Sequence, residues 1–319
     1  MKHTLTILTA LLLAPLPALH AADSPKTADT VTIGSRIVVG YALASRPQFF
    51  TEPATRDFIL DRVTHIVLLG AAKFDEKGIV TADEKLLTAP LAATRAKNRR
   101  ISVVFGGPYA RVFADTQARD TLIAQVVAAC QRHQLDGADF DYEYPNTMQD
   151  RTHFEAFLNG LRVAAPKGML ISAAVNAWGA DKHLVPIGAM EALDWVFLMA
   201  YGPHPHRMTF ETADRELRNC LAWGVPPTKL VLGLPIYGAN GTDGPGYRDL
   251  LGSHVLDRSV DAHKNWHFNG PATIEKKTRH AAELGLGGIG WWYVGLDCQD
   301  DRSLMQTAVK ALLDTASNR

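Results

Sequence analysis

Short apolar runs alternate along the chain with longer segments in which apolar residues recur every three or four positions. The apolar runs are rich in Val, Ile, Leu and aromatic residues and have the length of buried β-strands. They lie at 36–41, 65–71, 101–105, 137–141, 170–175, 195–200, 230–235 and 287–292. The intervening segments have helical periodicity, most clearly at 120–133, 152–165, 212–223 and 273–284.

Eight alternations of strand and helix predict a fold of the α/β class, a (β/α)₈ TIM barrel in a single domain. A doubly wound open sheet is the alternative architecture. It would require a phosphate-binding turn or a reversal of the strand order, and no glycine-rich fingerprint follows the first predicted strand. The barrel is therefore the better interpretation of the pattern.

Residues 1–22 have the pattern of a secretory signal peptide, with a lysine near the start, an apolar run at 5–19 and small residues at the end. The apolar run is too short for a membrane anchor and contains two prolines. A short polar segment at 23–34 precedes the predicted barrel at 35–319. We therefore expect an exported protein, periplasmic or secreted, that does not insert into a membrane.

The composition fits one large domain, because the 319 residues are 47% hydrophobic and carry no formal net charge. No stripe of Lys and Arg marks a nucleic-acid surface, so we expect no nucleic-acid partner, and we expect a monomer. Three widely spaced cysteines, Cys130, Cys220 and Cys298, predict buried thiols without a disulfide. His204 and His206 lack the spacing of a helical zinc motif, and we expect no metal and no cofactor.

Three acids stand at steps of two at the end of the fourth predicted strand: Asp139, Asp141 and Glu143. The strand period places them on one face, within about 7 Å of one another. Their repulsion should raise at least one pKa, which keeps a carboxylic acid protonated near neutral pH. Barrel active sites lie at this end of the strands. A calcium loop or an acidic edge strand is the alternative, but the interleaved aromatic residues fit a calcium loop poorly.

Aromatic residues stand at the ends of other predicted strands. Each one alone could serve packing. Together, rings around carboxylates suit a sugar, whose C–H faces stack on the rings while its hydroxyls bond the acids. These residues are Tyr41, Trp178, Tyr201, Tyr237 and Trp292.

Over nearly the whole mature sequence the chain resembles the chitinases of glycoside hydrolase family 18. The most specific match is Asp136-x-x-Asp139-x-Asp141-x-Glu143, which follows that family's D-x-x-D-x-D-x-E signature. Supporting matches stand at other predicted strand ends: Val38-Val39-Gly40-Tyr41, Gly106-Gly107, Met199-Ala200-Tyr201, Gly-Leu-Pro-Ile-Tyr-Gly at 233–238, and Gly287-Gly288 followed by Trp292.

The resemblance implies a retaining glycosidase that hydrolyses β-1,4 bonds of glycans containing N-acetylglucosamine, with chitin or chitooligosaccharides as the first expectation. In such an enzyme the N-acetyl group of the substrate is the nucleophile. Glu143 would be the general acid and base, and Asp141 would hold the acetamido N–H. Asp139 would share a proton with Asp141, and Tyr201 would donate to the acetamido oxygen.

The same resemblance implies a set of substrate-binding residues. Trp292 would form the floor under the sugar, and the glycine pair would allow close approach of the backbone. The full set is Tyr41, Gly106, Gly107, Met199, Trp178, Tyr237 and Trp292.

The chain also departs from the family pattern. Gly202 stands where the family commonly has aspartate, and Val104 where it frequently has serine, so two polar groups near the acids are expected to be missing. The stretch 237–287 is too short for the full α+β domain that some members insert between strands seven and eight. We therefore expect an open cleft, and internal cleavage or action on a bulky glycan in place of processive release of disaccharides, with Trp266 as a candidate for the wall of the cleft.

Other functions remain open at this stage. One alternative is a weak or inactive chitinase-like protein that only binds carbohydrate, although such relatives usually replace the residue at Glu143. Another is an endo-β-N-acetylglucosaminidase acting on N-linked glycans or peptidoglycan. A third is a barrel hydrolase of different sugar specificity, which would leave Tyr201 and Asp141 without an acetamido partner. In the leading interpretation the partner is an oligosaccharide or polysaccharide that contains N-acetylglucosamine.

Overall fold

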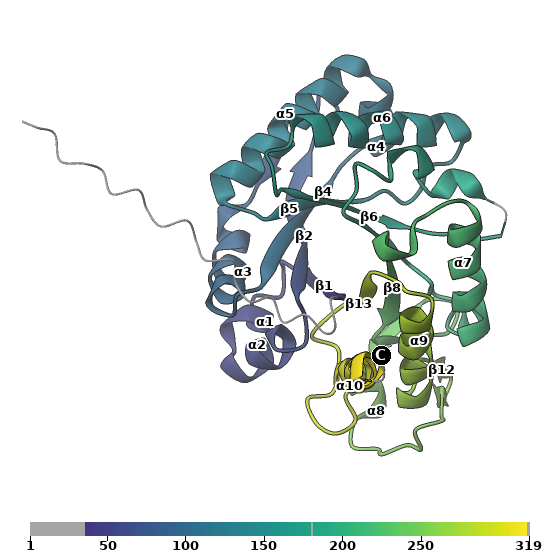
Figure 1. Cartoon of the computed structure of the whole chain (residues 1–319). Helices are drawn as coiled ribbons and strands as arrows, with labels where there is room; N and C mark the ends of the chain where they lie inside the picture. Colours follow the sequence, from purple (N-terminus) through teal and green to yellow (C-terminus); the bar gives the residue numbers. More distant parts are fainter. Residues whose placement is uncertain (1–35, 180, 318–319) are drawn as a thin grey trace, which may run out of the picture.

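Eight parallel strands close into a barrel in the computed structural model, which describes residues 36–179 and 181–317 (Figure 1). The ring closes because β1 pairs in parallel with both β2 and β13. Around the barrel the strands are β1 (Ile37–Leu43), β2 (His65–Phe74), β4 (Arg100–Gly106), β5 (Gly137–Asp141), β6 (Leu170–Val175), β7 (Trp195–Leu198), β8 (Leu230–Pro235) and β13 (Gly288–Trp292). The predicted TIM barrel is confirmed. The predicted signal peptide and the polar segment after it lie outside the described residues.

The barrel strands are buried on both faces, which is why they appear in the sequence as nearly continuous apolar runs. All six residues of β8 are buried. In β1 the side chains alternate: Val38 belongs to the core shared with the helices, whereas Val39 and Tyr41 belong to a second cluster inside the barrel. This alternation points Tyr41 toward the barrel axis, as the strand period requires.

Helices cover the outside of the barrel (Figure 1). Several begin at side-chain caps, such as Asp83, Asp115, Thr147 and Thr209, each of which accepts a hydrogen bond from the first turn. The α-helices of the described residues are α1 (Gln48–Thr51), α2 (Pro53–Leu60), α3 (Glu84–Ala96), α4 (Tyr109–Ala114), α5 (Thr116–His133), α6 (Met148–Ala164), α7 (Phe210–Ala222), α8 (Tyr247–Leu251), α9 (Pro271–Glu283) and α10 (Leu304–Ser317).

The prediction that a helix follows every barrel strand is wrong at one connection. Between β6 and β7 the described residues form only two 3₁₀ turns, η1 (Lys182–Leu184) and η2 (Ile187–Ala189). Pro186 and Gly188 in this short segment disfavour a continuous helix. A further addition is β3 (Val80–Ala82), which pairs antiparallel with the extended end of β2.

A small antiparallel sheet, and no larger domain, stands between β8 and β13. Its strands are β9 (Tyr237–Ala239), β10 (Asp243–Gly246), β11 (Ala262–His263) and β12 (Trp266–His267), in the order β10-β9-β12-β11. Trp266 packs inside this sheet, because a Cβ on Gly244 would lie 2.3 Å from its ring. It is therefore a packing residue and not the wall of the acidic pocket described below.

The three cysteines are buried and free, as the sequence predicted. Cys130 lies in α5, Cys220 in α7 and Cys298 in the loop before α10. None of the helices in the described part of the chain combines the length and apolar character needed to cross a membrane.

Candidate active site

Asp139 lies fully buried inside the barrel, where hydroxyl groups from two other strands hold it. The Tyr41 hydroxyl on β1 donates to Asp139 Oδ1 at 3.0 Å, and the Ser172 hydroxyl on β6 donates to Oδ2. Asp139 and Ser172 are register partners in the β5–β6 pair, so the pairing itself brings them together. Burial raises the pKa of Asp139 to about 6, and the two hydroxyl hydrogen bonds oppose this rise.

Asp141 and Glu143 lie above Asp139, at the carboxyl end of β5. The pKa of Asp141 is raised to about 8, chiefly by burial and then by the neighbouring charges of Glu143 and Asp139. Glu143 itself is exposed. Asp141 thus lies beside two other carboxyl groups, and its protonated form is favoured.

A cavity of about 470 Å³ opens above these acids at the carboxyl ends of the strands, a size suited to a small organic ligand. Eight of the eleven site residues predicted from the sequence line it. They are Tyr41, Asp141, Glu143, Trp178, Met199, Tyr201, Tyr237 and Trp292.

The other three predicted residues lie elsewhere. Asp139 lies beneath the cavity and does not line it, but it is hydrogen-bonded to Tyr41, which does. Gly106 lines a second cavity of about 550 Å³ at the ends of β2 and β4. Gly107 packs against Phe74, since a Cβ there would lie 2.7 Å from its ring. Gly107 therefore allows close packing after β4, a Cβ on Gly106 would meet no neighbour within 4 Å, and neither glycine lines the acidic pocket.

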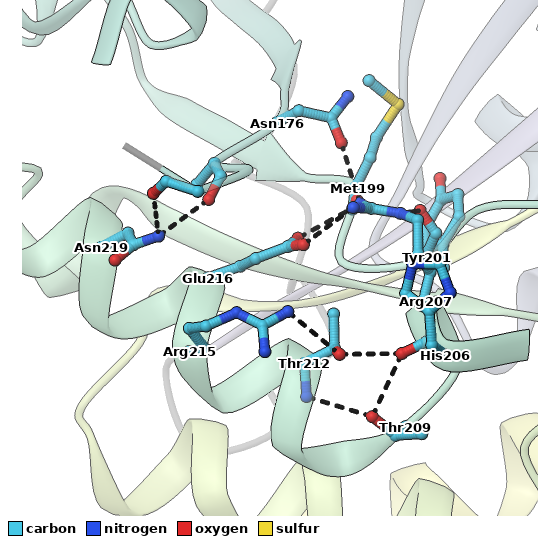
Figure 2. A network of polar contacts seen from close by, with 12 residues as sticks. Asn176, Met199, Tyr201, His206, Arg207, Thr209, Thr212, Arg215, Glu216 and Asn219 are labelled. Carbon is cyan, nitrogen blue, oxygen red and sulfur yellow. Dashed lines mark hydrogen bonds and ion pairs between the residues drawn. The ribbon is translucent and has the colours of Figure 1, made fainter. Parts of the chain in front are cut away.

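Both departures from the family pattern have a structural counterpart. Val104 is buried inside the barrel and carries no hydroxyl group. The hydroxyl group that bonds Asp139 comes instead from Ser172, on a different strand. At Gly202 the space is filled by Arg207, whose Nε would lie 2.7 Å from an added Cβ. The guanidinium group forms an ion pair with Glu216 on α7 (Figure 2).

Sequence reasoning missed Ser172, Arg207 and Glu216, and two of them left a signal. Glu216 lies on the buried face of α7, where a carboxylate among apolar residues indicates an ion-pair partner. Ser172 is a polar residue in an otherwise apolar strand. Arg207 ends a short 3₁₀ turn, η3 (Pro205–Arg207), in the connection after β7, and one turn is too short for periodicity to say where its side chain points.

Several buried polar atoms of the cavity lining have no hydrogen-bond partner among the described residues. These are Asp141 Oδ1, the Tyr201 hydroxyl, Asn176 Nδ2 and Trp178 Nε1. Buried polar atoms are nearly always paired, so these atoms mark where a polar ligand would bind. Burial raises the pKa of Tyr201 well above its ordinary value, and its hydroxyl therefore keeps the proton that it would donate.

Within residues 36–179 and 181–317, no group of three or more His, Cys, Asp or Glu side chains is placed to hold an ion. His204 lines the cavity, and its ring stacks on that of His206 with centroids 5.7 Å apart.

A family model described as "Glycosyl hydrolases family 18" matches residues 38–297. The chain is 26% identical over 262 residues to a class V chitinase of Arabidopsis thaliana, which covers 64% of this chain and 69% of that protein. It is 28% identical over 217 residues to chitinase C of Streptomyces lividans, covering 50% of this chain and 35% of that protein.

Solved structures show the same fold. A chitinase from Bacteroides thetaiotaomicron superposes with a TM-score of 0.75 at 22% identity, covering 88% of this chain and 97% of that chain. A plant class V chitinase mutant from Cycas revoluta, solved in complex with (GlcNAc)3, superposes with a TM-score of 0.70 at 23% identity, covering 86% of this chain and 99% of that chain.

Proposed function

Since the chain belongs to family 18 of the glycosyl hydrolases and is a glycoside hydrolase of the chitinase type, we propose that it cleaves β-1,4 bonds between N-acetylglucosamine units of chitin or its oligomers. The observation that carries this proposal is the row of three carboxyl groups beneath one aromatic-lined cavity. The raised pKa of Asp141 favours its protonated form next to the exposed Glu143, which is the proton donor of the proposed mechanism.

In the proposed first step, Glu143 transfers its proton to the glycosidic oxygen. The carbonyl oxygen of the substrate's own N-acetyl group attacks the anomeric carbon as the bond to the leaving sugar breaks, which gives an oxazolinium ion. In the second step, the Glu143 carboxylate takes a proton from water while the water oxygen attacks the anomeric carbon. The proton balance is restored, and the configuration is retained.

The remaining residues have roles in placing the acetamido group. Asp141 Oδ1 and the Tyr201 hydroxyl are an acceptor and a donor without partners in the described structure, which matches the N–H and C=O of an amide. Trp292 lines the same cavity, where its ring would stack under the sugar. Asp139, held by Tyr41 and Ser172, would adjust the charge of Asp141 during the reaction.

The test is a product assay with N-acetylglucosamine oligomers, an N-linked glycan and peptidoglycan. We expect cleavage of the oligomers and a loss of about 10²- to 10⁴-fold in kcat for Glu143→Gln, because the general acid is removed while the shape is kept. Glu191→Gln, at an exposed glutamate outside the cavity, is the matched control. Equal behaviour of wild type and Glu143→Gln on all three substrates would reject the proposal in favour of a carbohydrate-binding protein.

A further inference from the structure

Arg207 connects the loop after β7 to the carbonyl groups behind the cavity. Its Nε donates to the carbonyl oxygen of Tyr201 at 3.2 Å, and its Nη2 lies 3.4 Å from the carbonyl oxygen of Met199 and from Asn176 Oδ1. Figure 2 shows the guanidinium group among these acceptors. One planar cation therefore holds the ends of two neighbouring strands, β6 and β7.

Glu216 fixes the orientation of this guanidinium group. Its Oε1 lies 3.1 Å from Arg207 Nη1, and its side chain is 1% exposed against 12% for that of Arg207. Burial raises the pKa of Glu216, and the positive charge of Arg207 opposes this rise. Because a buried carboxylate without a partner is costly, Glu216 strongly favours the conformation in which Arg207 reaches it.

The Arg207 side chain also forms part of the cavity wall. Its Cζ lies 4.5 Å from the centre of the Trp178 ring, which is the range of a cation–π contact. Asn219, one turn after Glu216 on α7, donates to the carbonyl oxygens of Ala177 and Gly179 at 3.0 and 2.9 Å. Trp178 is thus held by the guanidinium on one side and by its flanking carbonyls on the other.

Other buried groups hold the loop from behind. The Lys277 ammonium on α9 and Asn269 Nδ2 both donate to the carbonyl oxygen of Met208, at 2.9 and 2.6 Å. Lys277 and Asn269 are each 1% exposed. Residue 208 directly follows Arg207, so the backbone that carries the guanidinium has little freedom.

Gly202 and Arg207 use the same space. An added Cβ at residue 202 would lie 2.7 Å from Nε and 2.9 Å from Cδ of Arg207, closer than real side chains approach. These atoms are not a free side-chain end, since the guanidinium beyond them is fixed by Glu216. Glycine at 202 is therefore a condition for the Arg207 conformation.

We propose that Arg207, oriented by Glu216, is a positioning residue that holds Tyr201, Asn176 and Trp178 in place for the bound sugar. It acts through the backbone and side chains that line the cavity, and its charge is already balanced by Glu216. This inference rests on the proposed function, because Tyr201 is the group that would meet the acetamido oxygen.

The experiment compares Arg207→Ala, Arg207→Lys and Glu216→Gln with wild type on N-acetylglucosamine oligomers. We expect at least about a tenfold lower kcat for Arg207→Ala, because small displacements of positioned groups are costly in rate. Lysine keeps the charge opposite Glu216 but cannot bond three acceptors in one plane, so Arg207→Lys should recover only part of the loss. Arg218→Met is the control: it changes an exposed arginine on α7, the helix that carries Glu216, and should leave kcat unchanged.

The melting temperature of each variant separates positioning from general stability. A folded Arg207→Ala or Glu216→Gln protein with wild-type kcat and KM, and only a lower melting temperature, overturns the inference. If Arg207→Ala does not fold, Arg207→Lys and Glu216→Gln decide by the same criterion, since both retain most of the packing.

A double-mutant cycle with Gly202→Ala tests the shared space. Gly202→Ala should lower kcat in the wild-type background and have little further effect in Arg207→Ala, where the colliding atoms are gone. Additive losses would contradict the geometry.

Failure of the proposed function is recognised separately. A wild-type protein that cleaves no oligomer rejects the proposed function alone. Calorimetric binding of the N-acetylglucosamine trimer to wild type and to Arg207→Ala then decides on Arg207, with at least about tenfold weaker binding expected and equal binding overturning the inference.

Discussion

Ser172 and Asp139 form the most deeply buried polar contact of the site, and we expect Ser172→Ala to disturb it. The substitution leaves one oxygen of a fully buried carboxyl group without a partner, which costs about 1–3 kcal/mol. It also removes a hydrogen bond that lowers the pKa of Asp139, so that pKa should rise. Chemical denaturation and the pH profile of kcat measure the two effects.

Tyr41→Phe removes the other hydroxyl bonded to Asp139 and provides the comparison for Ser172→Ala. A Ser172→Ala protein with unchanged stability and an unchanged pH profile would show that the contact has no energetic role.

Asp141 gives the protein a predicted pH dependence of stability. Its pKa is raised from its ordinary value to about 8, so between about pH 4 and pH 8 the folded state binds more protons than the unfolded state. The free energy of unfolding contributed by this group is therefore fully present at low pH and is lost as pH rises toward 8. In Asp141→Asn the melting temperature should fall less between pH 5 and pH 8 than in wild type, and an identical fall would contradict the assignment.

The sequence was sufficient for the acids but not for the groups that hold them. Asp139 and Asp141 lie in β5 and Glu143 follows two residues after its end, so their spacing alone predicted their proximity. Ser172 contacts Asp139 through strand register, and Arg207 contacts Glu216 through the path of a loop. Neither relation is encoded in local periodicity.

Among the elements, helix α5 offers a clean test of capping. Asp115 accepts a hydrogen bond from the Ala118 N–H at 2.8 Å and lies at the exposed start of this helix. Asp115→Ala should lower the free energy of unfolding by about 1 kcal/mol. Activity should not change, because the helix start does not line the cavity.

Asp120→Ala, at an exposed position of α5 past the first turn, should change stability by less than about 0.5 kcal/mol. Equal losses in the Asp115 and Asp120 variants would show that the charge of the helix, and not the cap, is responsible. Both values follow from chemical denaturation curves.

Strands were predicted more reliably than the segments between them. A barrel strand is buried on both faces, so its apolar run is visible without knowledge of its neighbours. The connection from β6 to β7 and the small sheet at 237–267 follow turns and tertiary packing, which periodicity does not describe. Trp266 illustrates the limit: it is a large aromatic in a loop near the site, yet it packs on Gly244.

At the scale of the whole molecule, the small sheet between β8 and β13 contributes Tyr237 and Asp243 to the wall of the cavity. Because a small sheet stands here in place of a larger domain, we expect a polysaccharide chain to be able to lie across the cavity. We expect long chitooligosaccharides to be cut internally, so early products should span a range of lengths in a chromatographic time course. Release of disaccharide alone from the first minutes would contradict this prediction.

The three buried thiols have a practical consequence for the entire fold. Burial raises the pKa of Cys130 and Cys220 to about 12, so the reactive thiolate is scarce while the protein is folded. Dithiothreitol should not shift the melting temperature, because no disulfide joins the three thiols. A thiol-specific dye should react only as the barrel opens, which makes the native cysteines an internal reporter of unfolding that needs no engineered label.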